Sequence, residues 1–334
     1  MMKSLKGSRR AIPFLTLALS LFIVVALGTT QALAAWKPTR PIEFIIMAGK
    51  GGGADRIARL MQKIVTQNKW SPQPLVPINK KGGSGAEAML YLLSKKGNPH
   101  VILVTLNSFF TTPALRKLPV NYTKLTPVYR LAMDTFLLWV NTKSGIKNMD
   151  DFVKAVKAKK GKWTMGGTGK MQEDQLVTNM LMQAYGLKGM ITYVPFRGGG
   201  TVAKNLAGGH VDSTVNNPSE GLPHYPGKMR PIAALTPERI PAFKEVPTFK
   251  ELGQPQLVYF MQRSINAPGG IPKDALNWYT DLFNKLCNSK EWKDYTSKKA
   301  LNRACLSGAP LGKFFANEDV KHKKLLMGMG LLKN

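Results

Sequence analysis

Four glycine-rich segments follow β-rich runs and precede helical ones, and each could bring backbone N–H groups to an anion. They read "AGKGGGAD", "NKKGGSGAEA", "GGTGKMQED" and "PFRGGGTVA". The first N–H groups of a helix have no partner within the helix and lie at the positive end of its dipole. Such turns favour anion binding by main-chain donors. Tight helix–strand packing is the other use of these glycines, and for "RGGG" both uses stay open.

The first segment does not have the spacing of a nucleotide-binding loop. A Walker A loop ends in Gly-Lys-Ser/Thr, whereas Lys50 precedes these glycines, and the Rossmann spacing needs glycine where Ala54 and Arg56 stand. No histidine has the context of a hydrolase or metalloprotease motif. The histidines are His100, His210, His224 and His322. We therefore expect a binding protein, not an enzyme, with no cofactor and no metal.

Two acids follow Gln172 where a helix is predicted to begin. Glu173 and Asp174 belong to "KMQED". Carboxylates in the first turn of a helix are stabilised by its dipole, which is one explanation for them. The same acids could instead hold a cation or the amino group of a ligand, and the sequence leaves these alternatives open.

The first 34 residues have the three-part layout of a secretory signal. Four basic residues precede the apolar run of residues 11–27, and the small-residue site Ala32-Leu33-Ala34 follows it. We expect cleavage after Ala34, with an uncleaved membrane anchor as the alternative. Residues 1–34 are thus predicted to be a signal peptide, and the mature protein to be periplasmic.

The charge of the chain raises nucleic acid as a partner. The formal net charge is +29 at pH 7, and the leader holds four basic residues and no acid, which leaves +25 for the mature chain. The lysines are spread from Lys37 to Lys333 among acids, without an arginine-rich arm or a zinc finger. We therefore expect attraction for anionic ligands and no nucleic-acid partner.

The chain has two cysteines, Cys287 and Cys305. In an oxidising compartment, an even number of cysteines in one region suggests a disulfide. A pair of buried free thiols is the alternative, and the spacing does not decide between them.

Strand-like and helix-like runs alternate along the chain, which is typical of an α/β protein with parallel sheets. Strands are expected at residues 42–47, 74–79, 101–106, 163–167, 190–196, 210–217, 230–235 and 302–306. Helices are expected at residues 54–68, 86–95, 148–159, 172–186, 201–207, 272–287, 291–299 and 310–329. The part after residue 250 is expected to be mostly helical and to cover the first domain.

This order predicts two α/β lobes with a ligand cleft between them. Residues 35–133 plus 250–334 are assigned to lobe 1, and residues 134–249 to lobe 2. The chain is expected to cross between the lobes near residues 132–135 and 236–258.

Five collinear segments resemble one known family. They are "PTRPIEFIIMAGKGGGADRIARL", "NKKGGSGAEA", "WTMGGTGKMQEDQL", "VPFRGGGTVAKNLAGGHVDSTVNNPSEGLPHYPGKMRPIAAL" and "VPTFKELG". Together they resemble the substrate-binding receptors of tripartite tricarboxylate transporters, the Bug or TctC-like family. The resemblance implies a two-lobe periplasmic-binding-protein fold, the type II Venus flytrap, which closes on a small carboxylate.

The resemblance also implies which residues bind the ligand. Gly51, Gly52, Gly53 and Asp55 would form one jaw, and Gly167, Thr168, Gly169 and Gln172 the other. Ser108, Asn216 and Asn217 would line the cleft. Lys50 replaces the usual proline of the first loop and could touch the ligand, whereas Asp55 is expected to cap its helix.

The implied function is that of a monomeric receptor, which binds a di- or tricarboxylate and delivers it to a membrane permease. Three departures from the family pattern keep a second ligand class open. They are the acids Glu173 and Asp174, the residue Lys50, and the aromatic pair Phe109 and Phe110. An amino acid or an aromatic carboxylate is therefore the alternative ligand, and a secreted enzyme on the same fold is the remote one.

Overall fold

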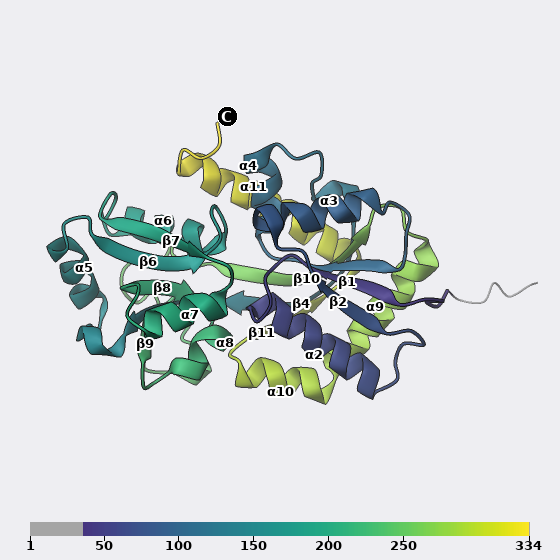
Figure 1. The fold of residues 1–334 in the computed structure, drawn as a ribbon, viewed down its shortest axis with the longest axis horizontal. Helices are drawn as coiled ribbons and strands as arrows, with labels where there is room; N and C mark the ends of the chain where they lie inside the picture. Colours follow the sequence, from purple (N-terminus) through teal and green to yellow (C-terminus); the bar gives the residue numbers. More distant parts are fainter. Residues whose placement is uncertain (1–35, 334) are drawn as a thin grey trace, which may run out of the picture. The chain divides into compact units, whose positions relative to one another are not determined.

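The computed structural model describes residues 36–333, and the predicted leader lies outside the described residues. Two β-sheets, each flanked by helices, make up this part of the chain (Figure 1). We call the six-stranded sheet with its helices lobe A, and the five-stranded sheet with its helices lobe B. The predicted α/β class is confirmed.

Lobe A begins with the predicted alternation of strands and helices. Its first three strands are parallel, in the spatial order β2-β1-β3, and every residue of β3 is buried. The strands are β1 (Ile42–Ile46), β2 (Leu75–Asn79) and β3 (Val101–Val104). Helices α2 (Gly53–Gln67) and α3 (Ala86–Ser94) connect them on opposite sides of the sheet. The order reverses between β1 and β3, which opens a crevice beyond their carboxyl ends.

The rest of the lobe A sheet differs from the prediction of a parallel sheet. Strands β4 (Leu125–Thr135), β10 (Phe260–Pro268) and β11 (Asn302–Leu306) extend it in the order β3-β10-β4-β11, with antiparallel pairing. The sequence predicted neither β4 nor β10, although the part after residue 250 is mostly helical, as expected. β10 buries polar residues such as Gln262 and Arg263, so it shows neither an apolar run nor an alternation.

Lobe B repeats the reversal of strand order. Its sheet has the order β7-β6-β8-β5-β9, in which β6 pairs in parallel with β7 and β8, whereas β5 is antiparallel to β8 and β9. The strands are β5 (Leu137–Asn141), β6 (Trp163–Thr168), β7 (Ile191–Phe196), β8 (Ser213–Asn216) and β9 (Met229–Ala234). The order reverses between β6 and β8, so this sheet also has a crevice at its carboxyl edge. Trp139, Phe243 and Val246 pack in the core beside it.

The remaining helices follow the predicted ranges closely, apart from α4 and α8, which the sequence did not predict. They are α4 (Ser108–Arg116), α5 (Met149–Ala158), α6 (Glu173–Ala184), α7 (Gly199–Ala207), α8 (Pro218–Gly221), α9 (Lys273–Asn288), α10 (Lys290–Lys298) and α11 (Gly308–Gly328). Short 3-10 helices lie at Gly82–Gly85, Tyr122–Lys124, Thr142–Ser144, Leu222–His224 and Pro241–Phe243. A disulfide joins Cys287 of α9 to Cys305 of β11.

The chain crosses between the lobes twice, and the two crossings are hydrogen-bonded to each other. β4 passes directly into β5 through Phe136, and residues 235–259 lead from β9 back to β10. The Leu235 N–H donates to the Phe136 carbonyl at 3.0 Å, and the Tyr259 N–H donates to the Leu235 carbonyl at 3.0 Å. The two crossings are therefore held to each other through Leu235.

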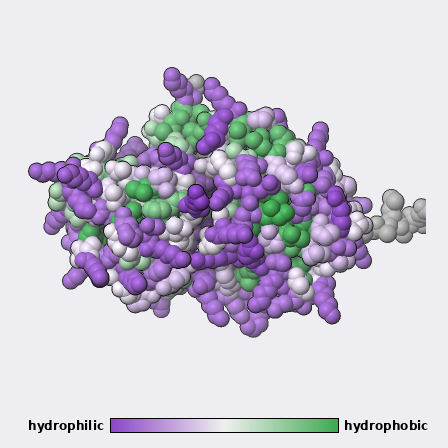
Figure 2. Space-filling view, viewed as in Figure 1, coloured by the Kyte–Doolittle hydropathy of each residue, from purple (hydrophilic) through white to green (hydrophobic). Residues whose placement is uncertain are grey.

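Hydrophilic side chains cover most of the face shown in Figure 2, in keeping with the many lysines of the sequence. Within residues 36–333, no helix has the length and apolar character needed to cross a membrane.

Candidate functional site

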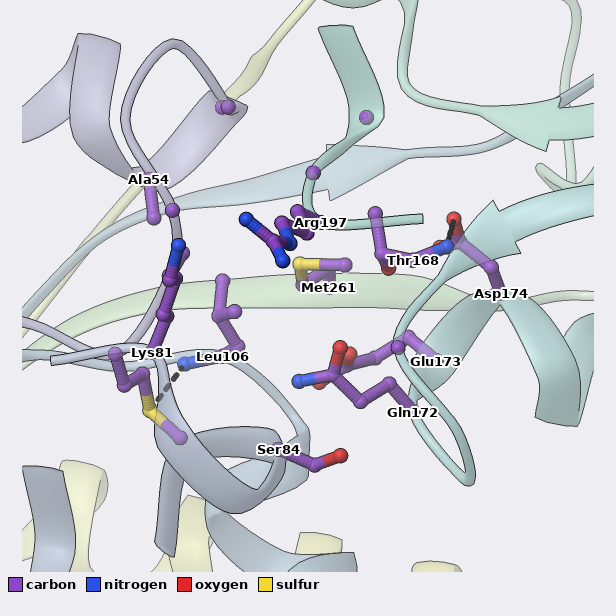
Figure 3. A pocket seen from close by; sticks show the side chains of 18 of the residues that line it. Ala54, Lys81, Ser84, Leu106, Thr168, Gln172, Glu173, Asp174, Arg197 and Met261 are labelled. Atoms are coloured by element: carbon purple, nitrogen blue, oxygen red, sulfur yellow. Dashed lines mark hydrogen bonds between the residues drawn. The ribbon is translucent and has the colours of Figure 1, made fainter. Parts of the chain in front are cut away.

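A cavity of about 540 Å³ is lined by residues of both lobes. It lies beyond the strand ends where the order of each sheet reverses, and its size is typical of small-molecule sites. We call it the main cavity (Figure 3). Six of the predicted site residues line it: Gly52, Gly53, Thr168, Gly169, Gln172 and Asn217.

Glycine at two positions allows the lobes to approach each other beside this cavity. A side chain at Gly49 would place its Cβ 2.6 Å from the Arg197 carbonyl oxygen, across the lobe boundary. A Cβ at Gly200 would lie 3.1 Å from the Gly51 carbonyl oxygen, also across this boundary. These glycines therefore serve close backbone contact between the lobes, in addition to any contact with a ligand.

Three main-chain donors expected near the ligand are already occupied by carboxylates of the protein. The Gly53 N–H donates to Glu220 Oε1 at 3.0 Å, and the Thr168 N–H donates to Asp174 Oδ2 at 2.8 Å. The Ser108 N–H, at the start of α4, donates to Glu173. The donors of Gly53 and Ser108 belong to lobe A and their acceptors to lobe B. The anion that these helix ends favour is thus a side chain of the chain itself.

The side chains of Glu173, Asp174 and Glu220, which we call the wall carboxylates, are buried in the lining of the main cavity. Burial raises the pKa of all three. For Asp174 the negative charge of Glu220 raises the pKa further, well above its usual value. From the sequence, Glu173 and Asp174 could either stabilise the start of their helix or bind a cation or an amino group. Glu220 was not predicted as a site residue.

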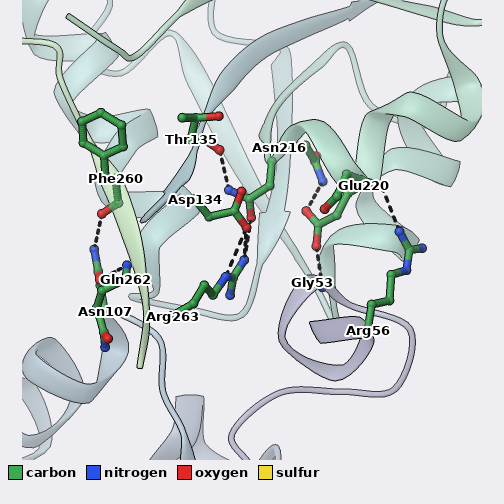
Figure 4. Close-up of polar contacts among 12 residues, drawn as sticks. Gly53, Arg56, Asn107, Asp134, Thr135, Asn216, Glu220, Phe260, Gln262 and Arg263 are labelled. Atoms are coloured by element: carbon green, nitrogen blue, oxygen red, sulfur yellow. Dashed lines mark hydrogen bonds and ion pairs between the residues drawn. The ribbon is translucent and has the colours of Figure 1, made fainter. Parts of the chain in front are cut away.

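A buried ion pair of lobe A lies at the main cavity and is hydrogen-bonded to lobe B (Figure 4). Arg263 of β10 pairs with Asp134 of β4, with Nε 3.1 Å from Oδ2, and its Nη2 donates to Asn217 Oδ1 at 3.2 Å. Asn217 Nδ2 in turn donates to the Thr135 carbonyl at 2.6 Å. Burial raises the pKa of Asp134 despite the neighbouring guanidinium. Asn217 therefore orients the arginine as well as lining the cavity.

Further polar contacts across the lobe boundary surround the cavity. Arg56 Nη1 donates to the Ser219 carbonyl at 2.9 Å, and Ser84 Oγ donates to the Lys170 carbonyl at 2.9 Å. Asn216 does not line the cavity and instead donates to Glu220 Oε2 at 3.0 Å, which holds that carboxylate against Gly53.

Asp55 holds the first loop in a way that differs from the predicted helix cap. The cap position is Gly52, and Asp55 lies in the first turn, where it accepts the Gly51 N–H at 2.9 Å. Burial alone would raise the pKa of Asp55, but hydrogen bonds from Arg59, Gly51 and Asn79 outweigh it and lower the pKa. The carboxylate is buried behind the loop and does not line the main cavity.

Four other predicted residues lie outside the main cavity. Lys50 and Gly51 line a separate cavity of about 240 Å³, together with Arg56 and Lys204. Gly167 is buried within β6, and Ser108 is buried at the start of α4.

The aromatic wall suggested by Phe109 and Phe110 is not part of the cavity. Both rings are buried and pack against Phe315 of α11, with centroid distances of 5.7 and 5.6 Å. They follow Ser108 on α4, so the helix that the sequence did not reveal turns them into the core of lobe A.

Free polar groups reach into the main cavity beside the wall carboxylates. Figure 3 shows the Gln172 amide and the Arg197 guanidinium pointing into it. The Gln172 side chain is 9% exposed and makes no hydrogen bond to any residue between 36 and 333. Arg197 and Lys81 are exposed at the lining, and neither pairs with a carboxylate of the described chain. No group of three or more His, Cys, Asp or Glu residues in this part is arranged to hold a metal ion.

The model of the tripartite tricarboxylate transporter family receptor, TctC, matches residues 57–331. The chain belongs to this family. The TctC-family chain is 27% identical over 327 residues to "UPF0065 protein in gbd 5'region" of Cupriavidus necator, covering 98% of this chain and 97% of that one. It is 26% identical over 282 residues to "Protein BugT" of Bordetella pertussis, covering 81% and 84%.

Solved structures of similar fold include two whose titles name a bound carboxylate. An R. palustris protein with adipate superposes with a TM-score of 0.81 at 22% identity, covering 88% of this TctC-family chain and 98% of that chain. MatC from Rhodopseudomonas palustris with bound malate gives 0.76 at 20% identity, covering 86% and 99%. The two-lobe fold of periplasmic binding proteins and the prediction of a receptor, not an enzyme, are confirmed.

Proposed function

We propose that this receptor captures a small organic carboxylate in the main cavity and delivers it to the permease of a tripartite transporter. One observation carries the proposal. The Gln172 amide, which has no hydrogen-bond partner in the described part of the chain, points into a cavity of ligand size that both lobes line. Arg197 supplies a positive charge at the same cavity, and the amino end of α7 begins beside it at Gly199. These groups together suit a carboxylate.

The ligand classes left open by the sequence are a di- or tricarboxylate and an amino or aromatic carboxylate. Solved relatives hold malate and adipate, which supports a carboxylate in the present cavity. The aromatic variant loses its basis, because Phe109 and Phe110 are turned into the core. Phe196 does line the main cavity, but neither ring of the predicted aromatic pair does, and we propose a small carboxylate as the ligand.

The receptor role implies where the protein acts and how it is exported. We propose that residues 1–34 export the chain to the periplasm and are removed after Ala34, and that the mature protein acts as a monomer. The partners are the solute and the permease subunits, and nucleic acid is not among them. The supporting features are the layout of the leader and the family of the chain.

Calorimetric titration of the mature protein with a panel of small organic acids tests the proposal. We expect saturable 1:1 binding by members of the panel, weakened about tenfold or more in Arg197→Gln or Gln172→Ala, because each variant removes a hydrogen bond to a charged ligand group. Arg239→Gln, an exposed arginine distant in sequence from the lining, is the matched control. A protein that binds none of the acids, or variants that bind as tightly as the parent, would contradict the proposal.

A further inference from the structure

The wall carboxylates change what the main cavity can accept. Glu173, Asp174 and Glu220 are 1%, 3% and 6% exposed, and all three line the cavity. They project from α6 and α8 of lobe B. Their charges therefore meet whatever occupies the space between the lobes.

These acids also take the donors that a second ligand carboxylate would need. The N–H groups of Gly53, Ser108 and Thr168 each donate to one of them. A ligand carboxylate at any of these positions would have to displace a buried side chain, which would then lose its partner. Displacing a charged group from its hydrogen bond inside a protein is costly.

The charge balance around the wall carboxylates is negative. Among residues 36–333, the one buried cation beside them is Arg263, and it already pairs with Asp134. Burial of a di- or tricarboxylate would add like charge to this region, where charges interact more strongly than in water. A positive group on the ligand would instead offset the acids.

A second observation places the other end of the ligand. The Gln172 side chain precedes the wall carboxylates on the chain, is about nine-tenths buried, lacks a partner among the described residues and points into the cavity (Figure 3). Arg197 points into the same space. The cavity thus offers donors for one carboxylate at Gln172 and Arg197, and acceptors for a positive group at the wall carboxylates.

We propose that the ligand is a zwitterion whose single carboxylate binds Gln172 and Arg197 and whose ammonium group binds the wall carboxylates. This inference rests on the proposed function, because it assigns the ligand class of the same cavity. A zwitterionic ligand would distinguish this receptor from the similar proteins solved with malate and adipate. Neither malate nor adipate carries a positive group.

Matched pairs of acids test the inference. The mature protein is titrated with 4-aminobutanoate against butanoate, β-alanine against propanoate, and glutamate against glutarate. We expect at least one amino member to bind about tenfold or more tightly than its partner, the loss expected when a charged hydrogen bond is removed. Glutarate, which has a second carboxylate at the position of the ammonium group of 4-aminobutanoate, is expected to bind weakly.

The amide variants Glu173→Gln, Asp174→Asn and Glu220→Gln locate the effect. Each amide oxygen can still accept the N–H bond of its carboxylate, and thermal unfolding of each variant checks that it folds. We expect the variants to remove the preference for the amino member, and the exposed Glu251→Gln to retain it. If a variant does not fold, the matched-pair ratio of the parent protein still decides.

The possible outcomes separate this inference from the function on which it rests. Binding of glutarate or butanoate as tight as that of the amino partners overturns the zwitterion and leaves the carboxylate receptor standing. Dicarboxylate binding that appears only as the pH falls also overturns it, because it would show that the wall carboxylates bind as protonated donors. Binding of no acid in the panel overturns the proposed function and the inference with it.

Discussion

Replacing Arg263 with methionine tests how the two lobes are held together. The side chain is 1% exposed, spans from β10 to Asn217 of lobe B, and neutralises Asp134. Methionine has a similar reach without the charge. The variant therefore leaves the Asp134 carboxylate buried with no cation beside it.

The expected loss of stability is about 3–5 kcal/mol, the usual cost of removing one partner of a buried ion pair. Most of this cost comes from the stranded carboxylate, since burial already raises the pKa of Asp134 while Arg263 is present. For a protein of this length, the loss lowers the melting temperature by about 6 °C or more. Arg239→Met, which breaks an exposed pair with Glu251, should cost at most about 1 kcal/mol.

Thermal and urea unfolding of the mature protein measure these differences. The double variant Arg263→Met with Asp134→Leu removes both charges and should recover most of the loss, because neither member of the pair is then buried without the other. The single variant should also regain stability relative to the parent as the pH falls and Asp134 takes up a proton. A single variant no less stable than Arg239→Met, or a double variant worse than the single one, would refute the role given to this pair.

Three further predictions concern the lobe boundary, the disulfide and pH. Gly49→Ala should weaken solute binding by about fivefold or more, because its Cβ would meet the Arg197 carbonyl and overpacking costs about 1–3 kcal/mol. The control Gly227→Ala adds a methyl group in open space and should leave binding unchanged. Equal affinities of the two variants in calorimetric titration would contradict this prediction. Reduction of the Cys287–Cys305 disulfide should lower the free energy of unfolding by about 3 kcal/mol, the loop-closure entropy expected for a sequence separation of 18 residues. A melting temperature that reductant leaves unchanged would refute this prediction. The raised pKa values of the wall carboxylates mean that the folded state binds protons more readily, so the unliganded protein should gain more stability between pH 7 and pH 5 than its triple amide variant does. Equal gains in urea unfolding would contradict that sign. The charged and titratable groups facing these carboxylates are Asp134, Tyr193, Tyr259 and Arg263.

Local patterns predicted most of the helices and strands, because hydrophobic periodicity and glycine-rich turns depend only on residues that are close in the sequence. The helix beginning near Gly53 and the fully buried β3 are examples. Strand β10 shows the limit of this approach. It buries Gln262 and Arg263, whose side chains are hydrogen-bonded to Thr105 and Asp134, far away in the sequence. No local pattern signals such a strand.

The sequence predicted that glycine-rich loops meet at one cavity, but not which charged side chains occupy their N–H groups. The glycine loops do meet at the main cavity, as the family resemblance implies. The N–H donors of Gly53 and Thr168, however, are satisfied by Glu220 and Asp174. Glu220 lies more than 160 residues from Gly53, as the sequence shows, so only the folded chain brings the two together. Sequence alone could indicate an anion at a helix start, but not that the chain supplies it.

A crystal structure of the mature protein with the solute that it binds most tightly tests the central claim most directly. We expect the solute in the main cavity, in contact with both lobes, with its carboxylate within hydrogen-bond distance of the Gln172 or Arg197 side chain. A solute bound elsewhere would contradict that claim. One such place is the separate hollow of lobe B beside Trp163 and Asp212.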